Sequence, residues 1–151
     1  MESIAGWLGF DTRKLEEYLA QRPREVIASL KTVFQFGKQS SFVKIVQPLL
    51  NMVTISPVFC KEMATLDGGI IPNVLELLEA TTDTFSKIRL LRILKSLFLC
   101  SDEQAEMLAQ FKLYQVIQQI AESDQSVIVS QITGELLISF VQVVKQRKNT
   151  L

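Results

Sequence analysis

Two arginines three residues apart are the side chains in this 151-residue sequence best placed to bind a charged ligand. Arg89 and Arg92 occur in the stretch FSKIRLLRILKSLFLCS, residues 85–101, which has the apolar spacing of a helix and places both on its polar side. Because residues three apart are neighbours on a helix, both guanidinium groups can reach one carboxylate or phosphate and bind it through paired hydrogen bonds. Lys95 lies close by and adds positive charge. The pattern predicts recognition of an anion.

The residues that catalysis usually requires are missing or badly placed. The sequence contains no histidine and no glycine-rich phosphate-binding loop. Glu76 and Glu79 lie one helical turn apart, but they fall opposite the apolar side of their predicted helix and are expected to be solvated. Cys60 and Cys100 occur in separate apolar runs, which favours buried, reduced thiols over a disulfide or a zinc site. We therefore expect no enzyme activity, no catalytic residue, no cofactor and no metal site.

The charge and hydropathy of the sequence exclude other classes of function. Sixteen basic residues balance sixteen acidic ones, so the basic excess typical of proteins that bind nucleic acid or an anionic membrane is absent. The first ten residues, MESIAGWLGF, lack the basic segment and long apolar run of a secretory signal. No uninterrupted apolar run reaches the roughly 18 residues of a membrane span. We expect a cytoplasmic protein that binds no nucleic acid and does not insert into a membrane.

The apolar residues recur at helical spacing along nearly the whole chain, which predicts an all-α fold of about eight or nine helices. The pattern also repeats after 42 residues, as when Val74 is aligned with Val116 and Leu94 with Leu136. Such a period indicates stacked units. The predicted domain spans residues 1–151, with an N-terminal cap at 1–22 and repeat units at 23–55, 56–100 and 101–148. Trp7, Leu8 and Phe10 of the cap are expected to cover the first repeat or mediate self-association. The predicted continuous core consists of Leu75, Leu78, Leu90, Leu94, Phe98, Ile117, Ile120, Ile132 and Leu136.

The stretch LDGGIIPNVLELLE, residues 66–79, resembles the signature of armadillo repeats, in which a Gly-Gly turn separates a first helix from a second. Gly68 or Gly69 is expected to adopt the left-handed conformation that ends a helix, and Pro72 suits the first turn of the next helix. The corresponding turn near Phe111 has no glycine. The resemblance to armadillo and HEAT repeats implies a right-handed α-solenoid of about three armadillo-like three-helix repeats.

In armadillo-like stacks the long third helices line a concave surface whose outward residues meet an extended ligand. Carried over to this sequence, the resemblance implies a partner-binding row of polar residues on the three long helices, which we call the ladder. The helix at residues 85–100 is expected to pack between neighbours, because its apolar arc is broad and a similar segment, without the charge, follows 42 residues later. The ladder consists of Lys44, Gln47, Asn51, Arg89, Arg92, Ser96, Gln131 and Glu135.

The order of apolar and basic residues in KIRLLRILKSLF, KLYQVIQQI and VIVSQITGELLISF resembles the C-terminal armadillo-like region of septation-initiation and mitotic-exit type Ste20-like kinases. The resemblance covers roughly residues 56–145. It implies a non-catalytic part of a larger kinase that binds a small GTPase or a spindle-pole scaffold in cell-division signalling.

Two alternatives remain open at the level of the sequence. A formin-like autoinhibitory domain is also built from armadillo repeats and binds an amphipathic helix. A homodimer could form through apolar groups at an exposed end of the stack. In the main prediction, the ligand is a protein segment that is acidic or phosphorylated.

Overall fold

The computed structural model describes residues 12–36 and 39–150, and these residues form helices and short connections without a strand. The prediction of an all-helical chain is confirmed. The helices are α2 (Thr12–Gln21), α3 (Pro23–Phe36), α4 (Gln39–Ile55), α5 (Pro57–Met63), α6 (Ile71–Ala80), α7 (Thr84–Cys100), α8 (Gln104–Phe111), α9 (Leu113–Ser123) and α10 (Val127–Thr150).

Several helices begin where the sequence provides a capping residue. Ser56 precedes α5, and its hydroxyl oxygen accepts a hydrogen bond from the Phe59 backbone N–H at 3.1 Å. Asp83 precedes α7 and accepts from the Ser86 backbone N–H at 3.0 Å. These bonds satisfy backbone donors that have no partner within the helix. Pro72 lies in the first turn of α6, as expected.

The connection between α5 and α6 uses its two glycines for different reasons. Gly68 has a φ of 85°, a left-handed conformation that confirms the prediction made for this turn. At Gly69 an added Cβ would lie 2.2 Å from the Thr65 carbonyl oxygen, so only glycine fits there. The next such turn, between α8 and α9, instead places Lys112 in the left-handed region, with φ 51° and ψ 45°.

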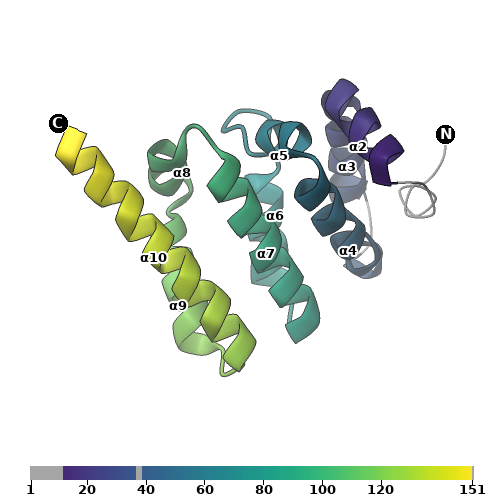
Figure 1. The fold of residues 1–151 in the computed structure, drawn as a ribbon. Helices are drawn as coiled ribbons and strands as arrows, with labels where there is room; N and C mark the ends of the chain where they lie inside the picture. The colour runs from purple at the N-terminus through teal and green to yellow at the C-terminus, as the bar shows by residue number, and fades with distance from the viewer. Residues whose placement is uncertain (1–11, 37–38, 151) are drawn as a thin grey trace.

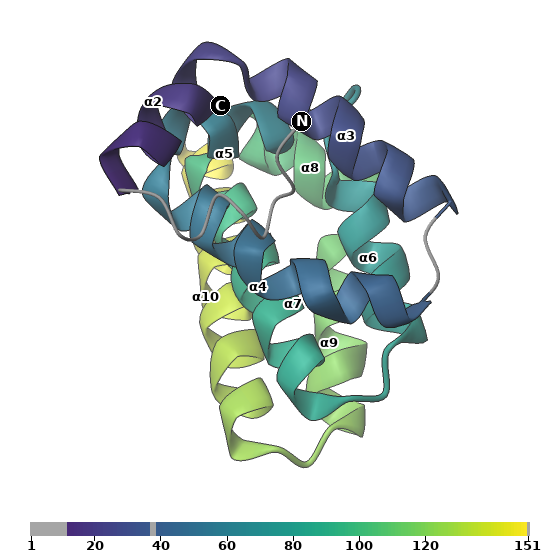
Figure 2. The same cartoon turned by 90° about the vertical axis from the view of Figure 1, so that its right-hand side faces the viewer.

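The three long helices lie next to one another. In Figure 1, α4, α7 and α10 follow each other from right to left, with α5 and α8 near the upper ends of α7 and α10. Helix α7 packs against α4 and α10 and also touches α5, α6 and α8. Figure 2 views the molecule from the right-hand side of Figure 1. It shows that α6 and α9 lie behind the row of α4, α7 and α10 as that row is seen in Figure 1. Helix α7 is therefore the centre of the described part of the molecule.

The core extends through all of these helices. Eight residues of α7 are buried, including Leu94 and Phe98, so the expectation that this basic stretch packs between neighbours is confirmed. The ring of Phe98 meets Phe140 of α10 edge to face, with a centroid separation of 4.8 Å. Of the nine predicted core residues, seven are buried, while Leu75 and Ile120 are partly buried against the same cluster.

The predicted N-terminal cap is described only in part. Trp7, Leu8 and Phe10 lie outside the described residues. Helix α2 carries Leu15 and Leu19 into the core and packs against α3, α4 and α5. These contacts place α2 beside the first long helix.

Helix α10 has one buried and one exposed apolar side. By length and composition alone, its segment Val127–Gln146, of mean hydropathy 1.8, could cross a membrane. No membrane span is expected here from the sequence, because polar residues such as Gln131 and Glu135 interrupt the apolar run. Its buried side packs on α7 and α9, whereas Ile138 on the opposite side is 62% exposed.

Candidate functional site

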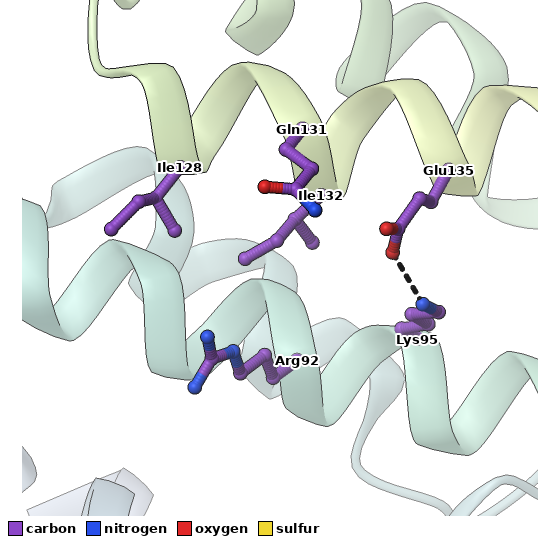
Figure 3. Close-up of a pocket in the computed structure, with 6 residues that line it drawn as sticks. All are labelled: Arg92, Lys95, Ile128, Gln131, Ile132 and Glu135. Atoms are coloured by element: carbon purple, nitrogen blue, oxygen red, sulfur yellow. Dashed lines mark hydrogen bonds and ion pairs between the residues drawn. The ribbon is translucent and has the colours of Figure 1, made fainter.

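Three ladder residues, one from α7 and two from α10, line a small cavity between the two helices. Its volume is about 160 Å³, and Figure 3 shows side chains of α10 facing α7 across it. Arg92, Gln131 and Glu135, all predicted members of the ladder, are thereby brought together. The cavity, which we call the Arg92 cavity, is lined by Arg92, Lys95, Ile128, Gln131, Ile132 and Glu135.

An ion pair closes one end of the Arg92 cavity. The Lys95 ammonium donates to a carboxylate oxygen of Glu135, as the dashed line in Figure 3 marks. The hydrogen bond from Lys95 and its positive charge lower the pKa of Glu135, and a hydrogen bond with Gln131 lowers it further. Glu135 therefore offsets the charge that Lys95 was expected to add to the surface.

Arg92 supplies the exposed positive charge of the cavity. No other described residue forms an ion pair or hydrogen bond with its guanidinium group, which extends along α7 below Ile128 in Figure 3. Arg92 is exposed, so the five N–H donors of its guanidinium group are available to a ligand beside Ile128 and Ile132. This arrangement can bind a carboxylate or a phosphate without first breaking an internal ion pair.

Arg89 is in a different environment from Arg92. Its side chain is half-buried and does not line the Arg92 cavity. The Ser86 hydroxyl and backbone N–H are the main causes of the lowered pKa of Asp83, and the charge of Arg89 lowers it slightly further. The positive charge of Arg89 thus acts partly on the carboxylate of Asp83, which caps the first turn of α7.

The other ladder residues do not reach the Arg92 cavity. On α4, the Gln47 Nε2 atom donates to the Asn51 Oδ1 atom at 2.9 Å, and Lys44 is exposed. Helix α4 packs directly on α7. Ser96 is half-buried, and its backbone carbonyl accepts a hydrogen bond from the Cys60 thiol at 3.4 Å.

Sequence reasoning missed the apolar part of the cavity. Ile128 and Ile132 are four residues apart on α10 and flank Gln131. That spacing is visible in the sequence, but Ile132 is predicted from it only as a core residue and Ile128 is given no role. A second hollow of about 450 Å³ between α3 and the α5–α6 connection was also missed, because its residues are distant in sequence: Arg24, Ile27, Ala28, Lys31, Glu62, Thr65, Asp67 and Gly68.

Among the residues that the structure describes, no three side chains of the types that usually bind metals come together. The chemistry that the site offers is recognition of an anion by Arg92, beside an amide and two isoleucines.

The chain is similar to three fungal proteins named cytokinesis protein sepH. The identity over 142 residues is 26% for the protein of Aspergillus niger, 27% for that of Aspergillus terreus and 25% for that of Emericella nidulans. The match covers 92% of this chain but only 10% of the length of each relative. No family model and no solved structure matches the chain. The comparisons thus show a low-identity similarity between this chain and about a tenth of a protein named for cytokinesis.

Proposed function

We propose that this chain is a non-catalytic protein-interaction module in cell division, whose ladder binds an acidic or phosphorylated segment of a partner protein. The observation that carries the proposal is the guanidinium group of Arg92, which has no partner among the described residues and lines a cavity together with Gln131, Ile128 and Ile132. The similarity to cytokinesis proteins supports a role in cell division. The resemblance to septation-initiation kinases supports a small GTPase or spindle-pole scaffold as the partner.

An armadillo-like solenoid is the architecture we propose for this module. The row formed by α4, α7 and α10 supports it, since third helices line one surface in such stacks. The left-handed turns at Gly68 and Lys112, which precede α6 and α9, support it as well. We place the module in the cytoplasm, within a larger kinase.

The chemistry of the Arg92 cavity defines the ligand. A charge-assisted hydrogen bond contributes about 1.5 to 3 kcal/mol, and an arginine can form two to one carboxylate or phosphate. Ile128 and Ile132 favour an apolar neighbour of the anionic residue, and the Gln131 amide can bond the ligand backbone. The preferred segment has one acidic or phosphorylated residue beside an aliphatic or aromatic one.

Peptide binding tests this assignment. Fluorescence anisotropy is measured for synthetic peptides in which Asp, Glu or phosphoserine is flanked by apolar residues, with Asn or serine versions for comparison. The double variant R89A/R92A should bind at least about tenfold more weakly than the parent, and added salt should weaken the parent's binding.

The matched control is R24A/K31A, which removes the same charge from α3. It should bind like the parent. Equal losses in the two double variants would mean that net charge alone is responsible. Unchanged affinity in R89A/R92A would place the interface elsewhere, most plausibly among the acidic residues between Asp102 and Glu135.

The cellular role and the type of partner are tested separately. Depletion of the protein should raise the fraction of dividing cells that fail cytokinesis, and the parent gene but not R89A/R92A should restore division. Binding of a GTP-loaded small GTPase would favour the kinase-like role. Binding of an amphipathic helix from the same full-length protein would favour the formin-like alternative.

Self-association is a second candidate function, and the exposed apolar side of α10 favours it. Ile138 is 62% exposed, and Val141 and Val144 also face solvent. A second copy could cover them. If these residues form the contact, I138D should convert a dimer measured by light scattering into a monomer, whereas S139D should not.

A further inference from the structure

The two cysteines lie side by side in the folded chain. Cys60 belongs to α5 and Cys100 is the last residue of α7, and their sulfur atoms are 2.9 Å apart. Both are free thiols. Cys60 is only 3% exposed, whereas Cys100 is half-buried. The fold therefore pairs a protected thiol with one that a small molecule in solution can reach.

The surroundings give the two sulfur atoms different chemistry. The hydrogen bond between the thiols lowers the pKa of Cys100; burial opposes this shift, whereas a backbone hydrogen bond and the charge of Lys61 add to it. The Lys61 ammonium remains close by through an ion pair with Asp102 at 2.9 Å, although the Asp102 charge opposes its effect on the thiol. The same hydrogen bond, together with burial and the charge of Cys100, raises the pKa of Cys60. Cys100 is thus the nucleophile, because it is the more exposed of the two thiols and the one whose pKa is lowered.

We propose that Cys60 and Cys100 form a redox-active dithiol, in which a hydroperoxide oxidises Cys100 and a disulfide then joins α5 to α7. In the first step the Cys100 thiolate attacks the terminal peroxide oxygen. The O–O bond breaks, Cys100 becomes a sulfenic acid, and the leaving oxygen takes up a proton to give water or an alcohol. In the second step the Cys60 sulfur attacks the Cys100 sulfur, the S–O bond breaks, and water leaves with the Cys60 proton. The two thiols lose two electrons and two protons in total, and the peroxide is reduced.

The position of the sulfur atoms favours the second step. They need to approach by only about 1 Å to reach bonding distance, and both belong to helices that already pack together. Cys60 lies directly against the sulfenic acid, whereas a thiol from another molecule must enter from solvent. The disulfide would enclose the whole of α6 in a covalent loop, which restricts the unfolded chain and stabilises the fold.

The test uses the purified chain and hydrogen peroxide. The expected product is a monomer that has lost two hydrogen atoms by intact mass and no longer reacts with a thiol reagent. Its melting temperature should rise by roughly 5 to 15 °C, and dithiothreitol should reverse the change. Without peroxide, a limiting amount of iodoacetamide should alkylate Cys100 well before Cys60, as peptide mapping can show. As the pH is raised, the alkylation rate of Cys100 should increase at a lower pH than the alkylation rate of free cysteine does.

Two variants separate the steps. C60A should stop at a sulfenic acid on Cys100 that dimedone captures, with no rise in melting temperature, and C100A should leave Cys60 reduced. The proposal is overturned if both thiols of the parent survive peroxide that oxidises free cysteine. It is also overturned if the product is an intermolecular dimer, or if the parent accumulates the sulfenic acid. The iodoacetamide order is measured on the parent, so it decides the role of Cys100 even if a variant fails to fold.

Discussion

Lys112 holds a backbone conformation that is normally left to glycine. It ends α8 and precedes α9 with φ 51°, and its side chain is exposed. Because a Cβ atom is crowded in the left-handed region, Lys112→Gly should raise the free energy of unfolding by about 0.5 to 1 kcal/mol. Urea denaturation followed by circular dichroism measures this. Lys112→Ala keeps the Cβ atom and should give no gain. An equal gain in both variants would assign the effect to the lost charge.

The ion pair between Lys87 and Asp124 predicts a pH-dependent stability. Asp124 accepts from the Lys87 ammonium at 2.8 Å and from the Ser126 backbone N–H at 2.8 Å, and the two charged side chains are 19% and 13% exposed. The bond from Lys87 and then that from Ser126 lower the pKa of Asp124. Since the folded pKa lies below the unfolded value of about 3.9, the stabilisation is complete above that pH. It is lost as the pH falls through the folded pKa.

Asp124→Asn should therefore lower the free energy of unfolding by about 1 to 2 kcal/mol at neutral pH, and this difference should shrink in acid. Urea titrations of the parent and the variant across the acidic range measure it. Glu135→Gln, in the more exposed pair with Lys95, should cost less. A loss for Asp124→Asn that is the same at every pH would mean that the ion pair is not its cause.

Helix α7 provides a matched pair of leucines for testing how much its burial matters. Leu94 is fully buried, whereas Leu99 on the same helix is 54% exposed. Leu94→Ala should lower the free energy of unfolding by about 2 to 5 kcal/mol, because it removes buried methyl groups and leaves a cavity. Leu99→Ala should change it by less than about 0.5 kcal/mol. Thermal and urea unfolding compare the two, and similar losses would contradict the central place of α7 in the core.

The helices of this chain could be predicted because their signals are local. Apolar spacing predicts α6, α7 and α9, and Pro72 and the Gly68 turn predict where α6 begins. The turn at Lys112 could not be predicted in the same way. The left-handed conformation there is imposed by the packing of α8 and α9, against the preference of the residue.

The sequence predicts which residues of the candidate site are polar on each helix, but not which residues of different helices meet. The polar positions of Arg92, Gln131 and Glu135 follow from helical spacing, and the fold brings these three together. The pairing of Lys95 with Glu135, and of Cys60 with Cys100, depends on how two helices approach each other in space. No pattern within one helix contains that information.

For the described residues as a whole, the position of α7 predicts a gradient of local stability. Helix α7 packs against α4 on one side and α10 on the other, whereas the main contacts of α2 are with α3, α4 and α5. In native-state hydrogen exchange, the backbone amides of α7 should therefore be the slowest to exchange and those of α2 among the fastest. Mass spectrometry of peptides from each helix measures this, and equal protection in α2 and α7 would show that the helices unfold as one unit.

The contact between Phe98 and Phe140 also has a consequence during protein synthesis. Helix α4 precedes α7 in the chain, so one flank of α7 has its neighbour as soon as it leaves the ribosome. The flank around Phe98 has to wait until Phe140 has been added, which at about 5 to 20 residues per second takes a few seconds. During that interval an aromatic ring that later becomes fully buried stands open on the nascent chain. This is the period in which a chaperone that binds exposed apolar segments would find its target on α7.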